Sequence, residues 1–163
     1  MLSIGLLVIL IGLLILPGYF FPSDRELIEK AIRKGAKAIE KKNLEALEEI
    51  VSDDYYGYYQ TSKSEAREQA KKDFQKIENL KIEIKKIEIE IKKESEEVDV
   101  VCEFVVSGFF KDAGIYNKVP FRGIFADKKD AVDRAKMIFK KEPDSNWRLV
   151  EFEVSIPDIT SKH

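Results

Sequence analysis

Residues 64–91, SEAREQAKKDFQKIENLKIEIKKIEIEI, decide the fold because the spacing of their apolar residues changes part-way along. In the first half, Ala66, Ala70 and Phe74 recur at the spacing of an amphipathic helix. In the second half, isoleucines alternate with Lys and Glu, as in a strand with one face in water. A three-residue step across Lys85-Lys86 interrupts this alternation, and a β-bulge there would restore it. The stretch therefore predicts a helix over residues 64–77, followed by a half-exposed strand over residues 82–91.

Two further helices are predicted on the N-terminal side of this stretch. Ser23-Asp24-Arg25-Glu26 is a capping box, because a serine precedes a glutamate by three positions. Apolar residues recur at helical spacing from there to about residue 41. Asn43 then caps a shorter helix over residues 44–51.

Four more strands are predicted on the C-terminal side, over residues 98–110, 118–126, 135–141 and 147–156. Residues 142–146 (EPDSN) supply turn chemistry between the last two. Residues 127–134 fit either a short helix or a charged loop. Helices first and strands after predict an α+β fold, with three N-terminal helices packed on an antiparallel sheet of about five strands.

The N-terminal segment differs from the rest of the chain. Met1–Phe21 carries no charged side chain, and a helix of that length would cross a bilayer core. A cleaved signal peptide is the alternative, but the segment has neither a basic start nor a small-residue cleavage pattern. We expect a transmembrane anchor over residues 1–22, a domain over residues 23–157 and a tail over residues 158–163. This places the protein in a bacterial or archaeal cell membrane as a single-pass protein, with the side of the domain left open.

Composition excludes several function classes. The chain has 28 Lys and Arg against 30 Asp and Glu, so it offers no basic field for nucleic acid. Its abundance of Lys and Glu is typical of proteins from hot habitats. Cys102 is the single cysteine and His163 the single histidine, which leaves no disulfide, catalytic His dyad or His/Cys metal site. We expect no metal and no cofactor, and we expect Cys102 to be a buried apolar residue.

Three groups of residues together carry a family resemblance. Asn43–Leu47 followed by Asp53–Tyr56, then Ser62–Phe74, and finally Trp147–Phe152 resemble segments of the nuclear transport factor 2-like superfamily in the same order. The resemblance covers about residues 24–156. It implies a curved antiparallel sheet wrapped around three helices, a cystatin-like α+β cone with a pocket at its open end. The superfamily includes isomerases, dehydratases, cyclases, carriers and assembly proteins, so the resemblance leaves the function open.

Candidate site residues follow from the aromatic cluster Tyr55-Tyr56-Gly57-Tyr58-Tyr59 and from the residues around it. Asp54 and Tyr55 are weak candidates for a catalytic pair, because acid–base chemistry needs a desolvated carboxylate beside a proton donor. Rings with polar tips could equally line a pocket, or close the mouth of the cone without any chemistry. The pocket candidates are Tyr55, Tyr56, Tyr59, Phe104, Phe121 and Trp147.

The second predicted strand suggests a partner surface. Val101, Val105 and Phe109 share its outer face with polar residues, so that face is partly apolar. Contact with another chain, as a protein partner or a homodimer, would explain this pattern, and so would packing by the terminal segment.

Two functions from different classes remain. In the first, the protein is a membrane-anchored, non-catalytic binding or assembly module acting through protein–protein contacts. Inner-membrane assembly proteins of type IV secretion systems combine a similar domain with one N-terminal span. In the second, the cone binds a small hydrophobic ligand or performs cofactor-free acid–base catalysis of the isomerase or cyclase kind. An internal cavity, and the groups that line it, would discriminate between them.

Overall fold

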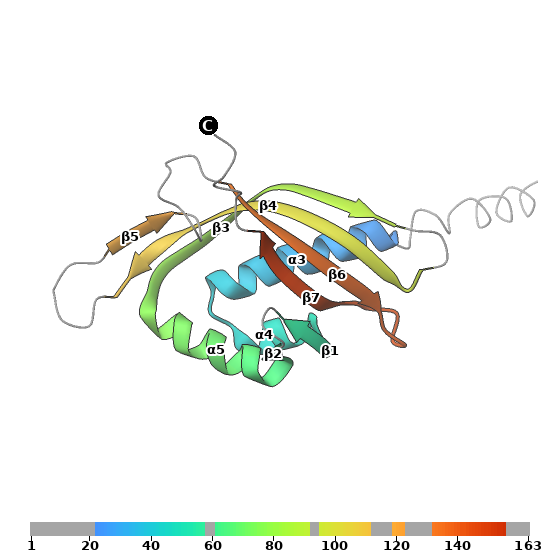
Figure 1. Ribbon diagram of the computed structural model, residues 1–163, viewed down its shortest axis with the longest axis horizontal. Coiled ribbons are helices and arrows are strands. Elements are labelled where there is room, and N and C mark those ends of the chain that lie inside the picture. The colour runs from blue at the N-terminus through green and yellow to red at the C-terminus, as the bar shows by residue number, and fades with distance from the viewer. Residues whose placement is uncertain (1–21, 58–60, 92–94, 112–118, 123–131, 156–163) are drawn as a thin grey trace, which may run out of the picture.

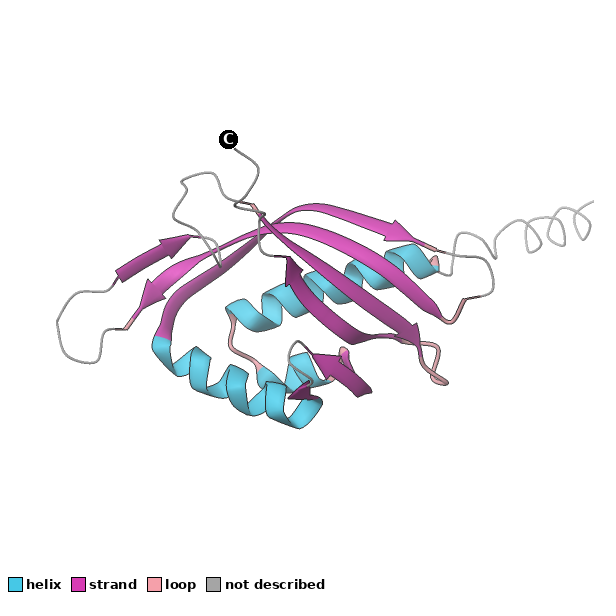
Figure 2. Cartoon of the chain, viewed as in Figure 1, coloured by secondary structure: helices cyan, strands magenta, loops and turns pink. Residues whose placement is uncertain are grey.

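The computed structural model describes residues 22–57, 61–91, 95–111, 119–122 and 132–155. A curved sheet arches over three helices, which lie against its concave face (Figure 1). Figure 2 shows the separation of the two layers. The helices are α3 (Asp24–Glu40), α4 (Leu44–Glu48) and α5 (Lys63–Lys76). The strands are β1 (Val51–Gly57), β2 (Thr61–Ser62), β3 (Ile77–Glu90), β4 (Glu97–Phe110), β5 (Val119–Arg122), β6 (Asp133–Lys141) and β7 (Trp147–Ser155). The predicted α+β class is confirmed.

The prediction of an entirely antiparallel sheet of about five strands is wrong in two respects. Within the described residues the sheet has seven strands, in the order β2-β1-β7-β6-β4-β3 with β5 paired to β4. It is also mixed, because β1 runs parallel to β7 while the other pairs are antiparallel. Strand β1 was not predicted, because three successive residues, Ser52, Asp53 and Asp54, are polar and interrupt the alternation of apolar and polar residues that indicates a strand.

The helix ends follow the local signals in the sequence. The Ser23 capping box is present, with Ser23 N donating to Glu26 Oε2 (2.7 Å) and Glu26 N to Ser23 Oγ (3.3 Å). Asn43 Oδ1 accepts from Ala46 N at 3.0 Å, which confirms the predicted cap of α4. The helix predicted over residues 44–51 ends early, at Glu48. The residues after Glu48 pair with the sheet instead of continuing the helix, because Leu149 N of β7 donates to Ile50 O (2.9 Å).

The helix-to-strand change in residues 64–91 is confirmed with shifted boundaries. A second capping box at Ser62 and Glu65 starts α5 one residue earlier than expected. Strand β3 begins at Ile77, five residues before the predicted start, and the register shift between Ile84 and Lys86 is the expected bulge. A further register shift between Glu78 and Lys81 accompanies a left-handed backbone at Asn79 (φ 50°).

The outer edge of β3 is tied to α3. Glu40 Oε1 accepts from the backbone N–H of Ile82 at 2.8 Å, and Arg25 Nη2 donates to the carbonyl of Ile89 at 3.0 Å. Side chains that occupy edge groups hinder pairing with a strand of another chain. The long edge strand is therefore partly blocked at two points.

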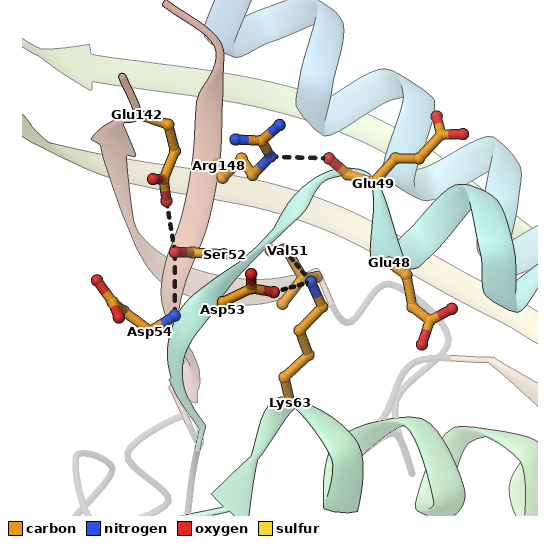
Figure 3. Close-up of a pocket in the computed structure, with 9 residues that line it drawn as sticks. All are labelled: Glu48, Glu49, Val51, Ser52, Asp53, Asp54, Lys63, Glu142 and Arg148. Atoms are coloured by element: carbon orange, nitrogen blue, oxygen red, sulfur yellow. Dashed lines mark hydrogen bonds and ion pairs between the residues drawn. The ribbon is translucent and has the colours of Figure 1, made fainter. Parts of the chain in front are cut away.

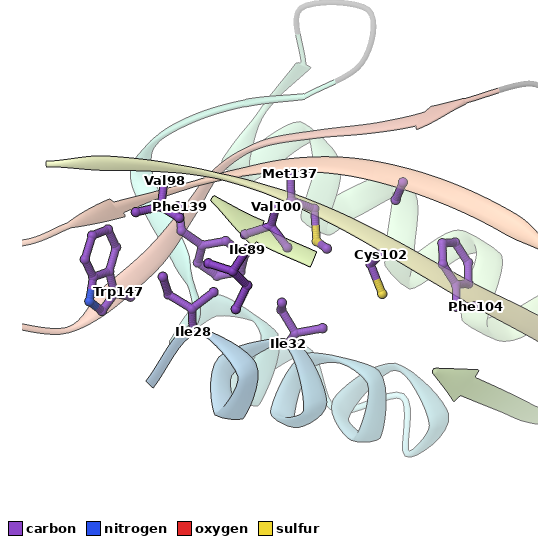
Figure 4. Close-up of a cluster of buried hydrophobic side chains, with 11 residues drawn as sticks. Ile28, Ile32, Ile89, Val98, Val100, Cys102, Phe104, Met137, Phe139 and Trp147 are labelled. Atoms are coloured by element: carbon purple, nitrogen blue, oxygen red, sulfur yellow. The ribbon is translucent and has the colours of Figure 1, made fainter. Parts of the chain in front are cut away.

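The core lies between α3 and the concave face of the sheet (Figure 4). Ile28 and Ile32 of α3 face the inward side chains of β3, β4, β6 and β7, and Ile28 is fully buried. Cys102 is 3 % exposed on the same face of β4, as the sequence predicts. Burial raises the pKa of its thiol to about 11, so Cys102 stays neutral near pH 7.

No helix in the described part of the chain is long and apolar enough to span a membrane. All of the predicted anchor (residues 1–22) except its last residue, and the whole predicted tail (residues 158–163), lie outside the described residues. Residues 127–131, predicted as helix or loop, also lie outside them, and Asp133 already belongs to β6.

The start of α3 is fixed to the β6–β7 turn through Asp24. Its Oδ1 accepts from Trp147 Nε1 (2.9 Å) and from Lys141 Nζ (3.0 Å). These two hydrogen bonds hold the pKa of Asp24 below its usual value of 3.8, and the bond from Trp147 has the larger effect. A lowered folded-state pKa contributes stability that is present above the unfolded pKa and lost as the pH falls through the folded value.

We therefore expect Asp24→Asn to flatten the acid limb of the stability curve. In the unmodified protein, part of the free energy of unfolding should disappear as the pH falls below about 4. Urea titrations between pH 2.5 and 6, followed by the fluorescence of the single tryptophan, measure this change. Equal acid sensitivity of both proteins would contradict the role given to Asp24.

Candidate functional site

A polar cleft of ≈350 Å³ lies beside β1, between the ends of α4 and α5 and the β6–β7 turn (Figure 3). Ser52 is 1 % exposed, donates to Glu142 Oε1 at 2.6 Å and accepts from the backbone of Asp54 at 3.2 Å. Lys63 Nζ contacts both Asp53 Oδ1 and the carbonyl of Val51 at 2.8 Å. These contacts hold β1 in place with polar groups that already have partners.

The two aspartates of this cleft are poorly placed for acid–base chemistry. Asp53 is 98 % exposed, and its hydrogen bond from Lys63 lowers its pKa. Asp54 is 70 % exposed and pairs with Lys140 Nζ at 3.0 Å. A general base at neutral pH needs a pKa near 7, which requires a desolvated carboxylate. The cleft therefore acts as an ion-pair arrangement that joins elements, and the catalytic role of Asp54 stays a prediction without geometric support.

A second hollow, the cone cavity, lies between α3, α4 and the concave face of the sheet. Its volume is ≈150 Å³. Apolar side chains and one glycine line it together with the neutral thiol of Cys102, and the lining includes no Asp, Glu, His, Lys, Arg or Tyr. The lining residues are Ala31, Ile32, Gly35, Ala36, Ile39, Leu47, Ile50, Val51, Ile82, Ile84, Cys102, Phe104, Ala135, Met137, Phe139, Leu149 and Phe152. Such a space suits a hydrocarbon group and lacks the means to move a proton.

Gly35 brings α3 close to the loop that follows α4. A Cβ atom at this position would lie 2.8 Å from Ile50 Cδ1, so the glycine leaves room for the Ile50 side chain at the cavity wall. Sequence periodicity places Gly35 on the inward stripe of α3 but does not reveal this close approach.

A third hollow, the α5 chamber, lies under α5 next to the cone cavity. Its volume is ≈150 Å³, and Leu47, Val51 and Leu149 line both spaces. The other lining residues of the α5 chamber are Leu44, Glu48, Tyr55, Lys63, Ala66, Arg67 and Ala70. The residues with polar groups are Glu48, Tyr55, Lys63 and Arg67, and the other lining residues are apolar.

The structure separates the predicted pocket residues. Phe104 lines the cone cavity and Tyr55 lines the α5 chamber. Tyr56 points away and is 54 % exposed, because successive residues of a strand face opposite sides. Trp147 is buried in the core beside Asp24 and lines neither space. Tyr59 and the side chain of Phe121 lie outside the described part of the chain.

Asp54 and Tyr55 do not form a pair. They are consecutive residues of β1, so Asp54 lines the polar cleft while Tyr55 lines the α5 chamber. The ring of Tyr55 lies over Gly57, where an added Cβ atom would approach the hydroxyl to 2.8 Å. Gly57 thus makes the space that Tyr55 occupies.

The predicted partner surface offers little exposed apolar area. Val105 is only 6 % exposed, and Val101 and Phe109 are part-buried. Val101 lies between Glu88 of β3 and Lys136 of β6, so charged neighbours flank it. Contact through this face stays a prediction.

Comparisons with known proteins come from solved structures. No protein-family model matches the sequence, and a search of curated proteins finds no match. A nuclear transport factor 2-like superfamily protein from Salmonella enterica serovar Typhimurium aligns with a TM-score of 0.64, covering 83 % of this chain and 94 % of that chain. The chain has the nuclear transport factor 2-like fold. Two further structures support this fold. A nuclear transport factor 2-like protein from Cytophaga hutchinsonii aligns with a TM-score of 0.60, covering 82 % of this chain and 98 % of that chain. A protein with a cystatin-like fold from Caulobacter vibrioides aligns with a TM-score of 0.60, covering 82 % of this chain and 91 % of that chain.

These likenesses concern the nuclear transport factor 2-like fold alone. The sequence identities are 11 %, 18 % and 15 % for the three structures. The fold hosts unrelated functions, so the function must be argued from the hollows of this chain and the groups that line them.

Proposed function

We propose that the protein is a membrane-tethered, non-catalytic binding module whose ligand is a small hydrophobic molecule held in the cone cavity. One observation carries the proposal, namely a partly open hollow of ≈150 Å³ lined by apolar side chains from α3, α4 and the sheet. Apolar cavities of about this size stay dry and bind benzene. The ligand group that fits is a benzene ring or a chain of about six carbons.

The acid–base alternative has less support. Both aspartates of the polar cleft are exposed and paired, and Tyr55 lies apart from them. The thiol of Cys102 is the one polar side-chain group that lines the cone cavity, and its raised pKa makes it a weak nucleophile. Binding without chemistry agrees with this lining.

The tether is the second part of the proposal. Met1–Phe21 is uncharged and long enough to cross a bilayer, and Ser23 starts α3 directly after it. A binding module held this close to the bilayer would take its ligand from the membrane phase, where small hydrophobic molecules concentrate.

Benzene titration of the full chain in a non-ionic detergent tests the proposal. We expect saturable binding with a dissociation constant of about 0.1–1 mM, since the ring leaves water for an apolar space of its own size. Binding to the folded state should also raise the unfolding temperature in proportion to occupancy. A signal that grows linearly with benzene, as partition into micelles does, and an unchanged unfolding temperature would contradict the proposal.

A further inference from the structure

The face of α3 that points away from the sheet carries a row of basic residues. Ile28, Ile32, Gly35 and Ala38 are the buried residues of this helix, so its opposite face meets solvent. Figure 1 shows the sheet on the covered side. The exposed residues between positions 30 and 41 are all basic, namely Lys30, Arg33, Lys34, Lys37 and Lys41. We call these five residues the α3 basic row.

Carboxylates neutralise little of the charge in this row. Lys34 forms an ion pair with Glu49, and within the described residues the other four members of the row form none. The half-buried Glu40 is occupied, because its Oε1 accepts from the backbone N–H of Ile82 at 2.8 Å. Glu26 is bound to the backbone N–H of Ser23 at 2.7 Å. The row therefore presents positive charge, although the whole chain has a net charge of −2.

The side chains of the row border an open hollow of ≈540 Å³ on the surface of α3. The hollow is lined by Glu26, Glu29, Lys30, Arg33, Lys34 and Lys37, so its two carboxylates lie at the N-terminal end and the cations follow. Lysine binds phosphate as a point charge, and arginine can donate two parallel hydrogen bonds to it. The cationic part of the hollow suits a phosphate group.

The row also lies near the uncharged segment Met1–Phe21. At 1.5 Å per residue, Lys30 is about 9 Å and Lys41 about 26 Å along the helix from Asp24. The backbone of Ser23 is extended (φ −65°, ψ 157°), so α3 does not continue any helix that precedes it. The axis of α3 can therefore lie along a bilayer that the uncharged segment crosses, which brings the row to the level of the lipid head groups.

We propose that the α3 basic row binds the anionic head groups of membrane phospholipids and holds α3 along the bilayer surface. A lysine or arginine close to an anionic bilayer strengthens membrane binding by about fivefold. The uncharged segment favours a lipid surface over a soluble polyanion, because it keeps the row beside the bilayer. This inference rests on the tether in the proposed function and is independent of the cone cavity.

Acetylation of the full chain in lipid discs tests the proposal. The discs contain phosphatidylcholine alone or with one-third phosphatidylglycerol, and mass spectrometry measures the acetylation rate of each lysine. The rates of Lys30, Lys37 and Lys41 should fall at least threefold in the anionic discs, because bound head groups cover these amines. The exposed Lys81 of β3 and Lys136 of β6 should change much less. About 0.5 M sodium chloride should remove the difference by screening the charges.

Two variants with equal charge separate the row from the general charge of the protein. The row variant carries Lys30→Gln, Arg33→Gln, Lys37→Gln and Lys41→Gln. The control variant removes four exposed lysines from other faces and carries Lys71→Gln, Lys72→Gln, Lys81→Gln and Lys136→Gln. Lys34 remains in both variants, and its protection by anionic lipid should be lost in the row variant and kept in the control. Both variants should keep the circular dichroism spectrum and the benzene affinity of the unmodified protein.

The outcomes distinguish this inference from the proposed function. Equal acetylation of the row in both kinds of disc, or equal protection of Lys34 in both variants, would overturn the lipid surface. Equal protection of the row in neutral discs by a short single-stranded DNA would also overturn it, because the row would then bind polyanions in general. Release of the full chain from membranes by alkaline carbonate would overturn the tether and the lipid surface together. A lack of saturable benzene binding would overturn the cone cavity alone.

Discussion

Replacing Phe139 by alanine is expected to lower the free energy of unfolding by about 3–5 kcal/mol. Phe139 is 3 % exposed, points inward from β6 and packs in the cluster between the sheet and α3. It also lines the cone cavity, so the neighbouring side chains have empty space beside them and cannot all close the gap. The loss is a large share of the total stability of an ordinary domain.

Urea unfolding followed by far-UV circular dichroism measures this loss. Lys136→Ala is the control on the same strand, because Lys136 is exposed on the outer face and should change stability by less than about 0.5 kcal/mol. Equal losses in the two variants would mean that the inward and outward faces of β6 are misassigned.

Replacing Ala135 by leucine is expected to abolish ligand binding while the fold is kept. Ala135 is fully buried on β6 and lines the cone cavity, so three added carbons extend into the space that the ligand needs. The filled void gains packing contacts, and crowding offsets part of that gain. We expect the free energy of unfolding to stay within about 1 kcal/mol and benzene affinity to fall at least tenfold.

Lys136→Leu is the matched control for this variant. It adds the same side chain one residue further along β6, on the face away from the cavity. It should bind benzene as the unmodified protein does, and micelles should dissolve equal amounts of benzene in both samples. Unchanged affinity in Ala135→Leu would place the bound molecule outside the cone cavity.

Local sequence signals predicted much of the fold. The capping box at Ser23 and the cap at Asn43 act within four residues of the chain, and the bulge near Lys85 follows from spacing alone. Strand β1 escaped prediction because its polar residues hide the alternation. Its register depends on Leu149 and Phe152 of β7, which lie about a hundred positions away.

The candidate site was harder to predict than the fold. The sequence singled out Phe104 and Tyr55, which line the two hollows, but it grouped them with Trp147, whose indole turns toward Asp24. Arg67 gave no signal, since a single arginine on the charged helix α5 resembles its solvated neighbours. Its place beside the α5 chamber becomes visible once α4, α5 and β1 are packed together, because cavities depend on side-chain volumes that no spacing rule supplies.

The most direct test of the cone cavity is nuclear Overhauser contact between bound benzene and methyl groups of the full chain. We expect contacts to Ile32, Ile50 and Met137, which line the cavity from α3, the segment after α4 and β6. These contacts should vanish in Ala135→Leu. Contacts confined to exposed methyls such as those of Ile91, or equal contacts in the filled variant, would contradict a ligand held inside the cone.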